Sequence, residues 1–279
     1  VTDVRSVLLT TSNLDTGGLQ SVLLEHAGLL ADAGHRVTAA VMRPVTAQVN
    51  LPRGVTVVEV TGEGRLAQLD SWLAICHTHA VDVIIDHHIL YNENWPWFVL
   101  AALSDGVPTI GWVHNFSLRP LFDNSQRINF LSTHMRLLLR TVTLSPTDVA
   151  FWKLQGLERV VYLPNPLSPL ALTALENGGT RERGSGRLEM AWWGRLDRST
   201  KQVLHLVEVA GHLRARGVDF RLTIVGPDSR NLTARQVRDH AIAQHVEDAV
   251  ELVGEQTPAQ LLKTLSHTHL LVSTSAIEG

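Results

Sequence analysis

Cysteine is nearly missing from this chain, which has one, Cys76, among 279 residues. No internal disulfide can therefore form, and zinc sites that need four cysteines, or two cysteines and two histidines, are excluded. A chain without disulfides suits a reducing compartment, so we expect a cytoplasmic protein.

The chain also lacks an excess of charge and a long apolar run. Its 24 basic and 27 acidic residues leave a formal charge of −3, which creates no global field that would collect nucleic acid. The most apolar long stretch, residues 98–113, is interrupted by Asp105 and Pro108, so it is well short of the roughly 20 residues of a spanning helix. No secretory signal is evident, because Asp3 and Arg5 flank a short apolar run. We expect a soluble protein with no nucleic-acid partner.

Motifs of several enzyme classes are absent as well. The sequence has no G-x-G-x-x-G fingerprint, Walker loop, H-E-x-x-H or G-x-S-x-G elbow, which removes the main support for dehydrogenases, P-loop kinases, zinc peptidases and esterases. The adjacent His87 and His88 point to opposite faces of an extended strand, so they do not easily bind one metal ion. The H-x-H pairs that begin at His77 and His267 are more typical of surface or packing histidines. We predict no metal site and no cofactor.

What the sequence does contain is an alternation of short β-branched apolar runs with amphipathic helical stretches. This pattern is typical of repeated β-α units around a parallel sheet, so we predict the α/β class. Leu19–Ala33 is the clearest helix, because its apolar residues fall on one face and Gly34 closes it. The predicted strands are Ser6–Thr10, Arg36–Val41, Val55–Val60, Asp82–Asp86, Thr109–His114, Thr141–Ser145, Arg159–Leu163, Leu188–Trp193, Phe220–Val225, Ala249–Val253 and Leu270–Ser273.

The length of 279 residues is nearly twice a typical domain of about 150 residues, so two domains are expected. Residues 176–189 are rich in glycine and charge and have almost nothing to bury, which indicates an exposed linker. We predict an N-terminal domain at 1–168, a connecting segment at 169–186 and a C-terminal domain at 187–279. The second domain has four predicted strands and stops directly after one, so we expect a truncated chain.

In open parallel sheets, ligands lie outside the carboxyl ends of the strands, so residues that follow strands are the candidates for a site. Gly17 and Gly18 follow the first strand and precede its helix, where glycine lets an anion approach backbone N–H groups. A plain turn would explain the same pair.

Imidazole, amide and carboxylate groups follow the fourth and fifth predicted strands. Such groups can hydrogen-bond sugar hydroxyls, relay a proton or bind metal. These residues are Asp86, His87, His88, Glu93, His114 and Asn115. Because neighbouring parallel strands end at one edge of the sheet, we expect these groups on one rim.

The sequence W-W-G-R-L-D-R-S-T-K connects a predicted strand to a helix that should begin near Lys201. Arg195 and Lys201 lie on this connection, where two cations and a helix N-terminus can converge on one polyphosphate. A solvated charged loop is the alternative. Two later strand ends carry Gly226 and Gly254, where a flat ring can lie against the backbone unless these are ordinary turn glycines. Glu278 is the last carboxylate on the same rim.

Two further stretches have ordinary explanations that we favour. Trp95, Trp97 and Phe98 precede an apolar helix and are expected in the core. Ser125–Arg140 has arginines among apolar residues and is expected to be a solvated helix, although contact with an anionic membrane surface stays open.

As a set, the motifs resemble glycosyltransferase family 4, and they occur in that family's order over essentially the whole chain. The shared motifs are G-G-L-Q before the first helix, V-H-N after the fifth strand, L-P-N-P at Leu163–Pro166, W-G-R-L with a lysine six residues after its arginine, I-V-G and S-A-I-E-G. The resemblance implies the GT-B architecture, in which two Rossmann-like domains face each other across a cleft where the reaction occurs. It also implies that the second domain mainly holds a nucleotide-sugar donor and the first an acceptor.

The resemblance further assigns roles to individual residues. Arg195 and Lys201 match the pair that binds the donor diphosphate, and Gly17 and Gly18 match the glycine loop that closes over it. His114 matches the histidine that faces the transferring sugar. These matches imply that Arg195 and Lys201 act as electrophilic catalysts.

Other matches concern the rest of the donor site. Glu278 matches a glutamate that contacts the donor sugar, the first of two set eight residues apart, so the second would lie beyond this sequence. Pro166 and Gln202 stand where the family commonly has glycine. The remaining substrate-binding candidates are Asn165, Gly226 and Gly254.

The resemblance implies a metal-independent hexosyltransferase of carbohydrate biosynthesis. It would move a sugar from a nucleotide-diphosphate donor to a saccharide or other hydroxyl acceptor with retention of configuration. Fixed cations at the diphosphate would stabilise the negative charge that develops on the leaving group. A nucleotide-sugar epimerase of the same fold, and a fragment that binds nucleotide or a partner without turnover, are the alternatives. The donor base and sugar, the acceptor, the linkage, the oligomeric state and peripheral contact with the inner membrane surface stay open.

Overall fold

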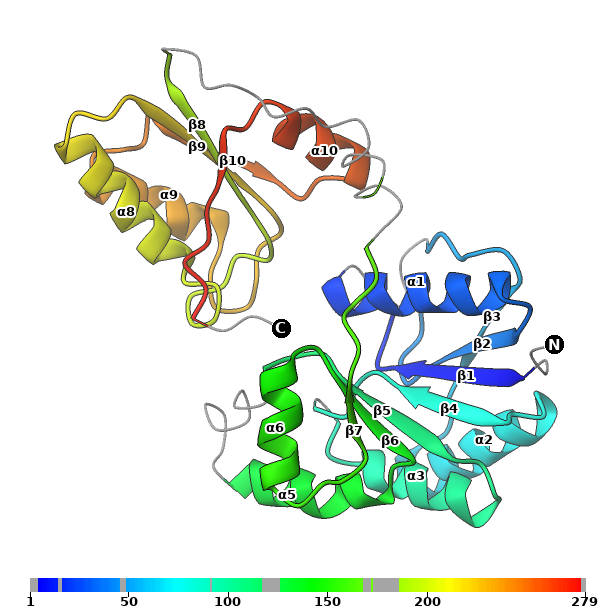
Figure 1. Cartoon of the computed structure of the whole chain (residues 1–279). Helices are drawn as coiled ribbons and strands as arrows, with labels where there is room; N and C mark the ends of the chain where they lie inside the picture. Colours follow the sequence, from blue (N-terminus) through cyan, green and yellow to red (C-terminus); the bar gives the residue numbers. More distant parts are fainter. Residues whose placement is uncertain are drawn as a thin grey trace. The chain divides into compact units, whose positions relative to one another are not determined.

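The computed structural model describes residues 5–14, 17–45, 49–90, 92–116, 126–167, 172 and 186–276. The chain separates into two compact units, Val1–Ser168 and Pro169–Glu278, which we describe one at a time (Figure 1). Unit 1 contains a sheet of seven strands and unit 2 a sheet of four. Every described strand pairing is parallel, so the α/β class predicted from the sequence is confirmed.

The sheet of unit 1 has the strand order β3-β2-β1-β4-β5-β6-β7. The chain moves outward from β1 to β3, then crosses back to place β4 on the other side of β1. Such a reversal is the topological switch point of a Rossmann-like sheet. The elements are β1 (Ser6–Thr11), α1 (Gly18–Asp32), β2 (Arg36–Val41), β3 (Val55–Glu59), α2 (Gly64–Thr78), β4 (Val83–Asp86), α3 (Trp95–Ser104), β5 (Thr109–Val113), α5 (Gln126–His134), the 3-10 helix η1 (Met135–Leu137), β6 (Arg140–Thr143), α6 (Pro146–Leu154) and β7 (Val160–Tyr162).

Helices cover the central strands of unit 1 on both faces. All residues of β1 are buried, including Ser6, Thr10 and Thr11, as expected for a central strand that is covered on both faces. Leu9 packs in a cluster with Leu23 of α1. Leu8, which points to the other face, packs in a cluster with Trp72 of α2 and Phe98 of α3. The central strands are therefore packed against helices on both faces.

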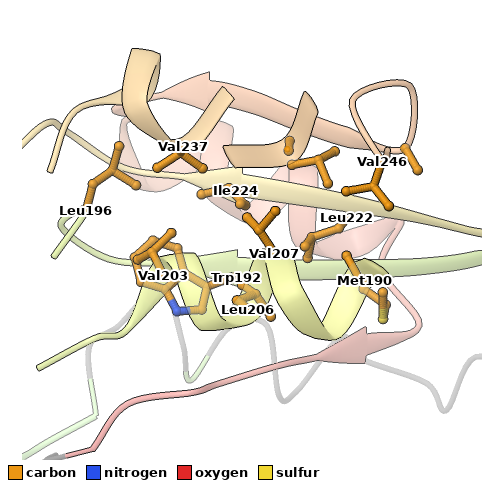
Figure 2. Close-up of a cluster of buried hydrophobic side chains, with 14 of the residues drawn as sticks. Met190, Trp192, Leu196, Val203, Leu206, Val207, Leu222, Ile224, Val237 and Val246 are labelled. Atoms are coloured by element: carbon orange, nitrogen blue, oxygen red, sulfur yellow. The ribbon is translucent and has the colours of Figure 1, made fainter. Parts of the chain in front are cut away.

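The sheet of unit 2 has the strand order β10-β9-β8-β11, so the chain again moves outward from its first strand and then crosses back to the other side of it. Its apolar core joins β8 and β9 to helices α8 and α9, with Trp192, Ile224 and Val207 packed together (Figure 2). Helix α10 lies on the opposite side of the sheet and has no buried residue. The elements are β8 (Leu188–Trp193), α8 (Val203–Ala215), β9 (Phe220–Val225), α9 (Ala234–Ala243), β10 (Val250–Gly254), α10 (Pro258–Ser266) and β11 (Leu270–Leu271).

One part of the predicted core is wrong. Trp95 and Phe98 are buried, but Trp97 is 48% exposed, and all three lie within α3 rather than before it. Successive residues of a helix point in different directions, so Trp97 leaves the face that packs on the sheet. Its ring instead lies under the guanidinium of Arg65, with Cζ 4.6 Å from the ring centroid.

Candidate functional site

Each sheet has one switch point, between β1 and β4 in unit 1 and between β8 and β11 in unit 2. Connections leave such a point toward opposite faces, and α/β proteins commonly bind ligands just outside it. Several residues predicted from the sequence lie there. Gly17 and Gly18 follow β1, His87 follows β4, and Arg195 and Lys201 follow β8.

Asp197, which the sequence did not reveal, organises the loop between β8 and α8. Its Oδ1 accepts hydrogen bonds from the backbone N–H groups of Ser199 at 2.9 Å and Thr200 at 2.6 Å, and from the Thr200 hydroxyl at 2.6 Å. Its Oδ2 accepts one from Nδ2 of Asn231 at 3.1 Å. Burial alone would raise the pKa of the Asp197 carboxyl, but the hydrogen bonds from Thr200, Asn231 and the Lys201 amide lower it well below its ordinary value. An aspartate two residues before Ser-Thr, as in Asp197-Arg198-Ser199-Thr200, is a usable signal for such a turn.

The backbone amides before α8 are consequently occupied. Those of residues 199–201 all point at the Asp197 carboxylate, so an anion at this loop would depend on side chains and on the first turn of α8. That helix begins at Val203, two residues after Lys201 and close to the predicted start, and no side chain caps it. Gln202 has φ 49°, a left-handed conformation. Glycine adopts this conformation more easily than glutamine, and glycine is the residue commonly found at this position in family 4.

Lys201 lies at the switch point of the second sheet. It lines a pocket of about 300 Å³ together with Trp192, Trp193 and residues 271–273, so the pocket lies at the ends of β8 and β11. Arg195 is exposed on the same loop. The two cations thus lie on one connection beside a pocket, and their convergence on a polyphosphate stays a prediction.

The segment after β11 is hydrogen-bonded to the loop between β8 and α8. The Thr274 hydroxyl donates to the backbone carbonyls of Lys201 at 3.3 Å and Gln202 at 3.1 Å. The N–H of Ala276 donates to the carbonyl of Thr200 at 2.8 Å. Glu278, predicted to contact the donor sugar, lies outside the described residues.

The backbone conformation at Gly226 and Gly254 favours glycine at both positions. Gly226 has φ 146°, and a Cβ there would lie 1.8 Å from the carbonyl oxygen of Gly194, so only glycine fits. Gly254 has φ 71° with open space around it, so only its conformation favours glycine. The N–H of Gly226 donates to the Gly254 carbonyl at 2.8 Å, which joins the exits of β9 and β10. These requirements exist without any ligand, and the binding roles of both residues stay predictions.

In unit 1, three histidines and a tryptophan form a cluster beside the switch point, in which His26, His87 and Trp112 are buried and His114 is partly buried. Nδ1 of His87 lies 2.7 Å from Nε2 of His114, and the His26 ring centroid lies 4.1 Å from that of Trp112. Burial lowers the pKa of His26 to about 4, that of His114 to about 3 and that of His87 well below its ordinary value. All three imidazoles are therefore neutral at pH 7.

His88 has different partners from its neighbour His87, as expected for adjacent residues of an extended segment. Its Nδ1 lies 2.6 Å from Oδ1 of Asp86, and its backbone N–H donates to the same oxygen at 2.9 Å. Burial would raise the pKa of Asp86, but the charge and hydrogen bonds of His88 lower it below its ordinary value. Glu93 does not join this pair, because it is exposed and lies 3.4 Å from Arg127.

The remaining candidates of unit 1 are more scattered. Gly17 is the N-cap of α1 with an extended φ of 172°, and no side chain caps that helix. A Cβ on Gly18 would meet open space, and one on Gly17 would lie 2.3 Å from Oε1 of Gln20, the end of a flexible side chain, so neither glycine is required by backbone strain. Asn165 is exposed after β7, the edge strand of the sheet, and is not beside the β1–β4 switch point.

Two other kinds of site are not found in the described part of the chain. It contains no cluster of three or more histidine, cysteine, aspartate or glutamate side chains arranged to hold a metal ion. None of its helices has the length and apolar character needed to cross a membrane.

No family model and no curated protein matches this chain, but solved structures match its fold. HepE from Anabaena, crystallised with UDP and glucose, matches with a TM-score of 0.70 at 15% identity, over 97% of this chain and 74% of its own. Sucrose-phosphate synthase from Thermosynechococcus elongatus matches with a TM-score of 0.74 at 14% identity, over 97% of this chain and 75% of its own. WaaG, a glycosyltransferase involved in lipopolysaccharide biosynthesis, matches with a TM-score of 0.64 at 14% identity, over 97% of this chain and 75% of its own. The chain therefore has the α/β fold of the GT-B glycosyltransferases.

Proposed function

We propose that this chain is a nucleotide-sugar-dependent glycosyltransferase similar to family 4. It would transfer a hexosyl group from a nucleotide-diphosphate sugar to a hydroxyl of a saccharide or other acceptor, with retention of configuration. The observation that carries the proposal is the position of Arg195 and Lys201, on the loop after β8 at the switch point of the second sheet. Support also comes from the fold shared with HepE, which was crystallised with UDP-glucose.

The proposed chemistry depends on charge at that loop. As the glycosidic bond breaks, negative charge builds up on the leaving diphosphate, and fixed cations lower the barrier most when they lie where that charge develops. Because Asp197 occupies the backbone amides of residues 199–201, the side chains of Arg195 and Lys201 would supply most of this stabilisation. The reaction as proposed needs no metal ion and no cofactor.

The other predicted residues keep the roles that the resemblance implies. His114 would contact the transferring sugar with Nδ1, because its Nε2 already lies 2.7 Å from Nδ1 of His87. Glu278 would contact the donor sugar. The remaining proposed substrate-binding residues are Gly17, Gly18, Asn165, Gly226 and Gly254.

The proposal is tested by donor binding and turnover. Calorimetry with UDP, GDP and ADP sugars identifies the donor, and release of nucleoside diphosphate with a panel of hydroxyl acceptors measures transfer. We expect Lys201→Ala to lower turnover about 10²- to 10³-fold, the loss typical for a group that stabilises transition-state charge. Lys263→Ala is the matched control, because it removes one exposed cation from the last turn of α10 in the same unit.

Three outcomes would count against the proposal in different ways. Absence of binding to UDP, GDP and ADP sugars would contradict donor binding by this chain. Turnover of Lys201→Ala within about twofold of the wild type would remove the role given to that cation. An altered sugar nucleotide formed without any acceptor would identify an epimerase instead.

A further inference from the structure

The contact between His87 and His114 is a hydrogen bond between two neutral rings. Their nitrogens are 2.7 Å apart, and the ring planes differ by 19°. A ring nitrogen points its proton or lone pair in the plane of the ring. The ring centroids are 4.9 Å apart, which is nearly as far as a 2.7 Å contact between the nitrogens allows, so the two nitrogens face each other between the rings, as a hydrogen bond requires. The ring of Trp112 lies nearly parallel to both, at 8° to His87 and 13° to His114, with ring centroids 5.7 Å and 6.1 Å away.

Only one proton can occupy this hydrogen bond, so the two rings have two possible arrangements. In one, Nδ1–H of His87 donates to Nε2 of His114, and His114 carries its own proton on Nδ1. In the other, Nε2–H of His114 donates to Nδ1 of His87, and His87 carries its own proton on Nε2. The tautomers of both rings are therefore set together.

The surroundings of His87 distinguish these arrangements. His87 is completely buried, and its Nε2 has no hydrogen-bond partner among the described residues. A proton on Nε2 would make this a buried N–H group without an acceptor, the least tolerated kind of unsatisfied polar group. A bare lone pair at the same place costs less, so His87 carries its proton on Nδ1.

We propose that His87 is a positioning residue that donates Nδ1–H to Nε2 of His114 and thereby fixes the proton of His114 on Nδ1. His114 is only partly buried, and none of the described residues is hydrogen-bonded to its Nδ1. Nδ1–H is then the polar group that His114 can present to a ligand. It would act as a hydrogen-bond donor to a ligand oxygen, and not as a proton acceptor.

The consequence for catalysis rests on the proposed function. If His114 contacts the transferring sugar, it does so by donating to a sugar or phosphate oxygen. It would then orient the donor and would not act as the general base that removes the proton of the acceptor hydroxyl.

The tautomer itself is tested without any substrate. Long-range ¹H–¹⁵N correlation spectra of the full chain, labelled at histidine ring nitrogens, distinguish protonated from unprotonated nitrogens at neutral pH. We expect a protonated Nδ1 and an unprotonated Nε2 for His114, and a protonated Nδ1 for His87. A protonated Nε2 on His114 would overturn the proposal, whatever the enzyme assays show.

Substitutions separate the hydrogen bond from packing. His87→Phe keeps a ring in the cluster but removes the donor, so the His114 nitrogens should shift toward an average of both tautomers. His87→Asn keeps an N–H group near the position of Nδ1 and should restore the single tautomer. His26→Phe is the matched control, because His26 is equally part of the cluster but has no hydrogen bond to His114. Unchanged His114 shifts in His87→Phe would refute the positioning role.

Turnover gives a second readout. Under the proposed function, kcat of His87→Phe should fall about tenfold, the effect of losing one hydrogen bond, and His87→Asn should recover most of the loss. A wild-type chain that binds no donor would refute the proposed function, and the spectra would still decide the tautomer of His114.

Discussion

At the scale of single residues, Asp197 is the side chain on which the candidate donor loop depends most. A buried carboxylate is costly unless hydrogen bonds replace its water, and here backbone amides, hydroxyls and the Asn231 side chain do so. The same bonds tie the exit of β8 to the loop after β9. One carboxylate therefore determines the conformation of the loop that carries Arg195 and Lys201.

Removing this carboxylate should unfold the loop first and then weaken the whole unit. We expect Asp197→Ala to lower the free energy of unfolding by about 3 kcal/mol, because several buried donors lose their acceptor. Asp197→Asn should cost about half as much, since its amide oxygen still accepts. Urea unfolding followed by circular dichroism measures the difference.

The control for this change is Asp228→Ala. Asp228 is exposed and accepts one hydrogen bond, from the N–H of Ala234 at 2.8 Å, so its loss should cost about 1 kcal/mol or less. Equal effects of the two alanine substitutions would mean that Asp197 does not organise the loop.

At the scale of elements, the exits of β8, β9 and β10 are joined backbone to backbone. Gly194 donates its N–H to the Val225 carbonyl at 3.0 Å, and Gly226 donates to the Gly254 carbonyl at 2.8 Å. This close approach holds the three strand ends, and hence the loops beyond them, in one arrangement. Gly226 is the position where the approach leaves no room for a side chain.

The two glycines at these exits should respond differently to alanine. Gly226→Ala places a Cβ on a backbone carbonyl that cannot move aside, so we expect a loss of at least about 2–3 kcal/mol in stability. Gly254→Ala adds only the strain of a left-handed conformation, about 1 kcal/mol. Thermal unfolding of both variants checks the ranking, and a smaller loss for Gly226→Ala would contradict the close packing of these strand ends.

At the scale of the whole molecule, the buried histidines of unit 1 couple folding to pH. His26, His87 and His114 have pKa values lowered by burial, with His26 at about 4 and His114 at about 3. In the unfolded chain their pKa values return to about 6.5, so between these limits the unfolded state binds more protons than the folded state. Acid therefore favours unfolding.

Above about pH 7.5 these histidines are neutral in both states, so we expect them to add no pH dependence to the free energy of unfolding. We expect that free energy to fall as the pH drops from about 6.5 toward 4. Each histidine that is protonated only in the unfolded state adds about 1.4 kcal/mol per pH unit to the slope of the free energy of unfolding against pH. Urea titrations at a series of pH values measure the slope. His26→Phe should reduce this slope by the contribution of one histidine. An unchanged slope in that variant would mean that His26 is not buried and neutral in the folded state.

The apolar pattern of the sequence by itself determined the α/β class, and the predicted strands agree with the observed ones to within a residue or two at their ends. Strand and helix periodicities are local properties, so they can be read from neighbouring residues. The loops that carry the candidate residues were found for the same reason, because each directly follows a strand.

Only the tertiary structure decided which side chains meet. His87 and His114 are 27 residues apart, and Asp197 and Asn231 are 34 residues apart. These pairs form because parallel strands bring distant carboxyl ends to the same edge of a sheet. The strand ends predicted a shared rim for His87 and His114, but only the fold decides which side chains on that rim are in contact. Burial was decided in the same way: Trp97 and Trp95 belong to one apolar run, and only the packing of α3 against the sheet places one outside and the other inside.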